Sequence, residues 1–96
     1  MKKNLSIKKN DVKIYGMSNN DANETLTNLI KNCVDLTLKR TKRDKIVKKL
    51  KNGIEDISIH NPEIYDDNIR EQIFFYMDSV FNQMNYQEID IDELFI

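Results

Sequence analysis

Residues 69–84, IREQIFFYMDSVFNQM, carry the strongest helical pattern in this chain of 96 residues. Apolar side chains return every three or four positions, which places them on one face of an α-helix: Ile69, Ile73, Met77, Val80, Phe81 and Met84. Phe74 and Tyr76 widen that face, so we expect it to be buried against more than one element or against another subunit. The sequence predicts a helix over 66–85.

Two further helices are predicted before this one. The helix over 20–37 opens on a capping-box pattern, Asp21 followed by Glu24, and carries its own apolar stripe: Ala22, Leu26, Leu29, Ile30, Cys33 and Thr37. The helix over 42–56 is predicted from a second stripe: Ile46, Val47, Leu50, Ile54 and Ile57. Only two glycines and one proline occur, which argues against a β-sandwich with its frequent turns.

The two ends of the chain are predicted to be extended. Within a Lys-rich lead over 1–17, residues 12–15 alternate apolar and polar side chains, as a short half-buried strand does. The tail over 86–96 alternates acids with isoleucine and ends on apolar residues, so we expect it either to pair with this strand or to dock on a partner. The predicted fold class is mainly α: a single small three-helix domain over 1–96 with a short N-terminal strand and an extended acidic C-terminal tail.

The charged residues are divided between the two halves of the chain, although the net charge is only −1. Residues 1–51 carry 14 Lys or Arg and 5 Asp or Glu, whereas residues 52–96 carry 1 and 11. Such asymmetry indicates either an electrostatic partner or two halves that neutralise each other.

The basic charge is concentrated in residues 39–51, which hold eight basic side chains and one acid, Asp44. Three explanations stay open: a solvated helix face, a phosphate-binding surface for nucleic acid, and a contact with an acidic protein. The first predicts ion pairs between neighbouring antiparallel helices: Lys45, Lys48 and Lys49 with Asp67, Glu71 or Asp78. In the second, Arg40 and Arg43 are the candidates for bidentate contacts, because a guanidinium fork suits planar acceptors. The complete set of nucleic-acid-binding candidates is Lys39, Arg40, Lys42, Arg43, Lys45, Lys48, Lys49 and Lys51.

The side chains needed for catalysis or metal binding are scarce. His60 and Cys33 are the only histidine and cysteine, so one chain cannot supply a His/Cys zinc site. The acids near the C-terminus lack the glycine and the spacing of a calcium loop, and two isolated glycines cannot form a phosphate-binding loop. We therefore expect no catalytic residue, no cofactor and no metal.

A non-catalytic protein-interaction module is the expected function: an inhibitor, an immunity-type protein or an adaptor. Aromatic and aliphatic side chains of the third helix and the tail are typical of buried contacts and give the protein-binding candidates: Phe74, Tyr76, Phe81, Ile89, Ile91, Leu94 and Phe95. The alternative is a nucleic-acid-binding regulator, dimeric, that contacts phosphates through 39–51. Either function is compatible with a homodimer.

No targeting or membrane segment is visible. Met1-Lys2-Lys3 is not followed by the apolar region of a signal peptide, and no run approaches the ~18 apolar residues of a membrane span. With a single cysteine, this predicts a reducing, cytoplasmic location and no membrane partner. The abundance of Asn, Ile and Lys suggests an AT-rich gene, such as one from a phage or plasmid.

Overall fold

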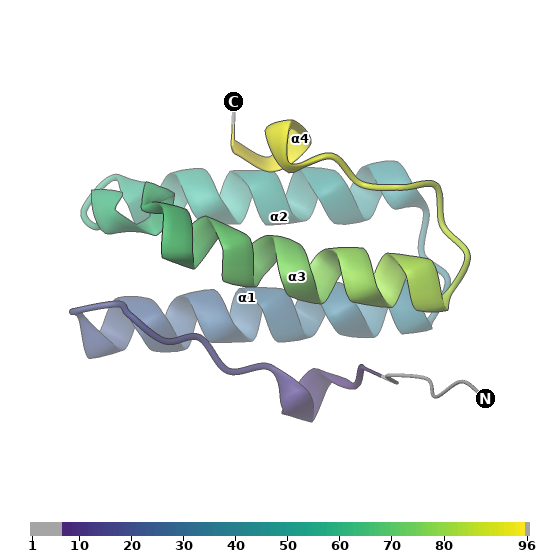
Figure 1. Cartoon of the computed structure of the whole chain (residues 1–96), viewed down its shortest axis with the longest axis horizontal. Helices are drawn as coiled ribbons and strands as arrows, with labels where there is room; N and C mark the ends of the chain where they lie inside the picture. The colour runs from purple at the N-terminus through teal and green to yellow at the C-terminus, as the bar shows by residue number, and fades with distance from the viewer. Residues whose placement is uncertain (1–6, 96) are drawn as a thin grey trace.

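A computed structural model describes residues 7–95, and these are mainly helical. The elements in chain order are η1 (Lys9–Asp11), α1 (Asn20–Leu38), α2 (Arg43–Ser58), η2 (Pro62–Tyr65), α3 (Asp67–Gln83) and α4 (Ile91–Phe95), where η denotes a 3₁₀-helix. In Figure 1, α1 and α2 form an antiparallel pair behind α3, α4 lies over α2, and the N-terminal segment runs along α1. Residues 1–6, which include Met1-Lys2-Lys3 of the predicted Lys-rich lead, and Ile96 of the predicted tail lie outside the described residues.

Helix α1 begins at a side-chain cap that the sequence pattern did not indicate. The Oδ1 of Asn19 accepts a hydrogen bond of 3.0 Å from the backbone N–H of Ala22. The helix therefore starts one residue before Asp21, and the predicted pairing of Asp21 with Glu24 is not the cap. The buried face of α1 follows the predicted stripe closely and consists of Ala22, Leu26, Ile30, Cys33, Val34 and Thr37.

A tight turn and a close helix contact set the α1–α2 pair. Arg40 adopts a φ of 65°, and the backbone N–H groups of Arg40 and Thr41 donate to carbonyls of the last turn of α1. In the interior of α2, Gly53 lies against Leu29 of α1. A Cβ at position 53 would be 2.5 and 2.7 Å from the two methyl carbons of Leu29. The glycine therefore allows the two helices to approach more closely than a larger residue would.

Helix α3 completes one hydrophobic core. The buried residues of its stripe are those that its periodicity indicates: Ile69, Ile73, Met77, Val80 and Phe81. They join the buried faces of α1 and α2, and Ile46, Leu50, Ile54 and Ile64 are fully buried beside them. None of the helices within residues 7–95 has the length and apolarity needed to cross a membrane.

The segment over 12–17 is extended, but it is not a strand, and no strand occurs within residues 7–95. Its alternation does bury two side chains, Val12 and Ile14. The hydroxyl of Tyr76 accepts a 3.0 Å hydrogen bond from the N–H of Lys13. The amide of Gln72 accepts from the N–H of Tyr15 at 2.8 Å and donates to its carbonyl at 2.6 Å. Because the described chain offers no second strand, side chains of α3 provide the hydrogen-bond partners.

The C-terminal segment also differs from the extended tail that was expected. Residues 86–90 cross from the end of α3 towards α2, and α4 then forms a short helix. Ile89 is 4% exposed and Leu94 is 1% exposed, so both belong to the core. The segment does not pair with the N-terminal segment, which lies on the opposite side of the bundle (Figure 1). These two apolar residues of the tail are thus buried by the chain itself.

Candidate functional site

The two arginines of the basic run hold the C-terminal segment. Nη1 of Arg40 donates a 3.0 Å hydrogen bond to the carbonyl of Met84, just after α3. Nε of Arg43 donates to the carbonyl of Gln87 at 3.2 Å, and its Nη2 donates to the carbonyl of Glu88 at 2.7 Å. Both guanidinium groups therefore have partners 44 or 45 residues away in the sequence.

Arg43 makes two further contacts that keep its side chain inside the fold. Its Nη2 lies 2.9 Å from Oε1 of Glu93, and its guanidinium carbon lies 5.6 Å from the ring centroid of Phe81. The ring of Phe81 in turn lies 5.0 Å from that of Tyr86, whose hydroxyl donates to the carbonyl of Thr41 at 2.6 Å. The start of α2 and the segment after α3 are therefore joined by several polar contacts.

The lysines of the same run point away from the core. Four of them form what we call the lysine face, and all four are exposed: Lys42, Lys45, Lys48 and Lys49. Lys39 pairs with Asp35 at 3.0 Å, while Lys51 is half-buried. With 3.6 residues per turn, the lysine face covers an arc of about 120°, and Arg43 lies outside that arc on the core side. The fold thus separates the lysines from Arg43.

The ion pairs expected between these lysines and α3 are not formed. The salt bridges found among residues 7–95 join Lys39 to Asp35, Arg43 to Glu93 and Arg70 to Asp67. Helix α2 packs mainly on α1, η2 and α4, so its exposed face is turned away from the acids of α3. The four side chains of the lysine face are therefore exposed to solvent and form no ion pair with the residues that the structure describes.

The protein-binding candidates fall into two groups. Phe81, Ile89 and Leu94 are at most 4% exposed and have almost no surface to offer a partner in this conformation. The others are partly buried: Phe74, Tyr76, Ile91 and Phe95. Phe95 packs edge-on against Tyr65 with ring centroids 6.3 Å apart, and Tyr76 holds the N-terminal segment.

The partly exposed candidates Phe74 and Ile91 line a groove between α3 and the C-terminal segment. Its volume is about 930 Å³, and we call it the acidic groove; its lining residues are Phe74, Asp78, Gln87, Glu88, Ile89, Asp90 and Ile91. Three carboxylates line the groove together with apolar side chains, and no basic side chain lines it. The sequence predicted that the third helix and the tail would act together, and the groove brings them together.

A second surface was missed by the search for buried stripes. Phe75 is 51% exposed and Tyr15 is 69% exposed, and both line a hollow of about 410 Å³ between α3 and the N-terminal segment. Position 75 is two residues from Ile73, which corresponds to the opposite side of a helix. A helical projection of α3 would therefore have identified Phe75 as an outward-facing aromatic residue.

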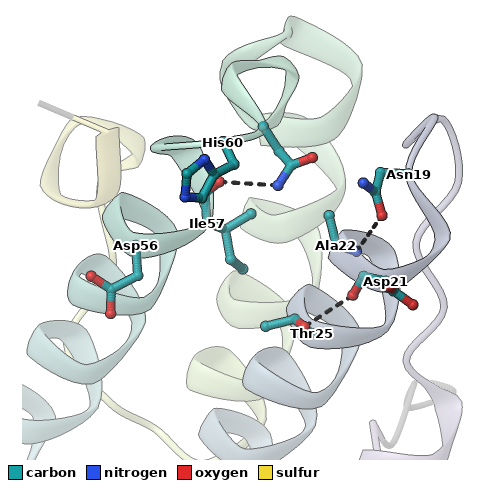
Figure 2. A pocket seen from close by; sticks show the side chains of 8 residues that line it. Asn19, Asp21, Ala22, Thr25, Asp56, Ile57 and His60 are labelled. Carbon is teal, nitrogen blue, oxygen red and sulfur yellow. Dashed lines mark hydrogen bonds between the residues drawn. The ribbon is translucent and has the colours of Figure 1, made fainter.

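The single histidine lies beside a smaller pocket of about 290 Å³ between the start of α1 and the end of α2. Figure 2 shows Asp21 and Asp56 on different helices, with their carboxylates directed away from each other. Within the described part of the chain, no group of three His, Cys, Asp or Glu residues is arranged to hold a metal ion. The pocket therefore lacks a ligand set for metal chemistry.

Cys33 is fully buried in α1, in the interior of the bundle. Burial raises the pKa of its thiol from 9.0 to about 12, and Lys49 opposes this rise. Because the thiolate is the reactive form, this residue behaves as a core side chain rather than as a nucleophile at neutral pH.

The fold and its surface define a small helical protein with an acidic groove between α3 and the C-terminal segment and a lysine-rich face on α2. Comparisons of the chain with protein-family models, with curated proteins and with solved structures find no match.

Proposed function

We propose that this protein is a non-catalytic interaction module that binds a basic, apolar segment of another protein in the acidic groove. The observation that carries the proposal is that Asp78, Glu88 and Asp90 line the same groove as apolar side chains, with no basic side chain among the lining residues. Such a module acts by occupying or presenting its partner, as an inhibitor, an immunity-type protein or an adaptor does.

The composition of the groove favours a cationic partner. Phe74 and Ile91, which are partly exposed, offer contacts to aliphatic side chains or to the stems of lysine and arginine. The surrounding carboxylates attract cationic heads and repel acidic segments, which gives specificity and steers association. The positive charge nearest this segment, on Arg43, is already paired with Glu93.

The groove is formed before any partner arrives. Its outer wall is the segment 87–91, whose carbonyls at positions 87 and 88 are held by Arg43. Its inner wall is α3, which is anchored in the core through Met77 and Phe81. A preformed site avoids the entropy loss of ordering a loop on binding, so a small interface can still bind usefully.

A defined peptide pair tests this proposal. One fluorescein-labelled peptide alternates arginine with leucine, and its counterpart alternates glutamate with leucine. We expect saturable binding of the basic peptide alone, measured by fluorescence anisotropy at moderate salt. Combining Asp78→Asn, Glu88→Gln and Asp90→Asn should weaken this binding at least tenfold, which corresponds to about 1.4 kcal/mol.

The substitutions are chosen to keep the fold. Oδ1 of Asp90 accepts from the N–H of Asp92 at 3.3 Å, and Asp90→Asn retains a side-chain oxygen that can accept the same hydrogen bond. The matched control combines Glu24→Gln, Glu55→Gln and Asp56→Asn at exposed positions of α1 and α2 outside the groove. It removes the same three charges and should not change the peptide affinity. Equal affinity for the two peptides, or full affinity in the groove variant, would contradict the proposal.

A further inference from the structure

The charges of α2 are arranged against the dipole of their own helix. Arg43 and Lys45 lie in the first turn, where the partial charge of a helix is positive, and Asp44 is the only acid of that turn. The last turn region carries Glu55 and Asp56 and no basic residue. Charges in these positions lower helix stability, because each lies at the end of like partial charge.

Repulsion between neighbours adds to this cost. Lys45 lies three residues before Lys48 and four before Lys49, so these ammonium groups are adjacent on the helix surface. Like charges at these spacings are destabilising. None of the three forms an ion pair with a residue in the range 7–95. Neither helix stability nor an ion pair within the described chain accounts for the lysine face.

The other basic segment does not contribute to the lysine face. Lys8, Lys9 and Lys13 belong to the N-terminal segment, which runs along α1 on the side away from α2 (Figure 1). The lysine face therefore consists of side chains at the start and in the first half of α2, apart from these three lysines. The lysine face extends from Lys42 to Lys49, which is about 10 Å along the helix axis at ~1.5 Å per residue. This length can meet a row of phosphates and is larger than one phosphate requires.

We propose that the lysine face binds the phosphate backbone of nucleic acid without recognising base sequence. The arginines that could make bidentate contacts with bases are engaged by the C-terminal segment, Arg43 through four acceptors on three residues. Lysine ammonium groups act as point charges and give affinity with little base preference. This site is separate from the acidic groove and does not depend on the proposed function.

The test uses the full chain and a fluorescein-labelled DNA duplex of mixed sequence, titrated by fluorescence anisotropy over a series of KCl concentrations. Four phosphate contacts predict a slope of log Kobs against log[KCl] of about −3.6. Unlabelled duplexes of unrelated sequence should compete equally well. Failure to bind the duplex even at the lowest salt, or clear preference for one sequence, would overturn the proposal.

Two matched variants locate the site. Combining Lys45→Glu, Lys48→Glu and Lys49→Glu should abolish duplex binding. The variant should keep the far-UV circular dichroism of the parent, because these side chains are exposed and form no ion pair with the described residues. Combining Lys8→Glu, Lys9→Glu and Lys13→Glu makes the same change in net charge on the other segment and should leave most of the affinity. Equal losses in the two variants would overturn the assignment to α2.

Two further measurements separate this site from other partners. Poly-glutamate, added as a competitor of the labelled duplex, should displace the duplex only weakly. Tight binding of poly-glutamate by a chain that does not bind DNA would identify an acidic protein surface as the partner and overturn the proposal. The groove variant with Asp78→Asn, Glu88→Gln and Asp90→Asn should bind the duplex at least as well as the parent. A loss of duplex binding in that variant would contradict a site on α2.

Discussion

Nη2 of Arg43 donates a hydrogen bond of 2.9 Å to Oε1 of Glu93, which joins the first turn of α2 to α4 across 50 residues of sequence. The two side chains are 22% and 36% exposed, so this pair is less exposed than the Lys39–Asp35 and Arg70–Asp67 pairs. The same guanidinium holds the carbonyls at positions 87 and 88. A residue of the basic run therefore fixes the outer wall of the acidic groove.

Replacing Arg43 should loosen that wall. We expect Arg43→Ala to lower the free energy of unfolding by about 2 kcal/mol, because charge-assisted hydrogen bonds and packing on Phe81 are lost together. Arg43→Lys keeps the charge but not the fork, and should recover only part of this loss. Urea unfolding followed by far-UV circular dichroism measures both, and hydrogen exchange should accelerate over residues 87–95.

The neighbouring exposed lysine supplies the control for Arg43. Lys42→Ala removes a cation at the next position without breaking a contact in the described chain, and its effect should stay within about 0.5 kcal/mol. If Arg43→Ala were as mild as Lys42→Ala, the C-terminal segment would not depend on the guanidinium as described.

Tyr76→Phe should release part of the N-terminal segment. The Tyr76 hydroxyl accepts from the N–H of Lys13 and lies 3.0 Å from the carbonyl of the same residue. We expect a loss of about 1 kcal/mol and faster hydrogen exchange at the Lys13 amide. The Tyr15 amide should stay protected, since Gln72 holds it. Tyr15→Phe makes the same chemical change at a side chain 69% exposed, and an equal loss there would argue against the Tyr76 contact.

The close approach of α1 and α2 predicts coupling between Gly53 and Leu29. Gly53→Ala gains helix propensity of about 1 kcal/mol, but the added methyl overlaps the Leu29 side chain. We expect Gly53→Ala alone to lower stability by about 1 kcal/mol, and to raise it by a similar amount in a Leu29→Ala background. Additive effects in this double-mutant cycle would show that the two residues do not compete for space.

The free energy of unfolding should fall at alkaline pH because of the buried thiol of Cys33. Burial raises the pKa of the folded thiol from 9.0 to about 12. Between these values the unfolded chain releases a proton that the folded chain keeps, so the contribution is complete below pH 9 and is lost as the pH rises towards 12. Unfolding free energies of the parent and Cys33→Ala should therefore converge over this interval. A constant difference between them would contradict the shift.

The helices could be predicted from the sequence because their buried faces are regular. The stripe of Ile69, Ile73, Met77 and Val80 is buried as its spacing indicates. The predicted helices over 20–37, 42–56 and 66–85 correspond to α1, α2 and α3, with ends that differ by up to two residues. Local spacing is sufficient here, since each helix buries one continuous face.

The ends of the chain could not be predicted in the same way. The alternation at residues 12–15 correctly buries Val12 and Ile14, but alternation does not show which groups will pair with the backbone. Side chains of α3, more than 50 residues away, provide those partners. In the tail, the acids suggested exposure, whereas burial of Ile89 and Leu94 draws the segment onto the bundle.

The separation of Arg43 from the lysines of residues 39–51 could also not be predicted from local sequence. Charge alone treats Arg43 and Lys45 as equivalent, although a helical projection places them on different faces. The acceptors of Arg43 lie 44 to 50 residues further along the chain, beyond the reach of any local pattern. The acidic groove likewise combines α3 with a segment whose course depends on that contact.

The most informative measurement is a ¹H–¹⁵N correlation spectrum of the full chain during titration with the arginine–leucine peptide. We predict that amide shifts concentrate at Phe74, Asp78 and residues 87–91, while amides of residues 45–49 stay in place. The Nε–H signal of Arg43 should remain visible and protected from solvent exchange throughout, because this group donates to the carbonyl of Gln87 in the outer wall of the groove. Shifts concentrated elsewhere, or an unchanged spectrum at saturating peptide, would contradict the assignment of the acidic groove as the binding site.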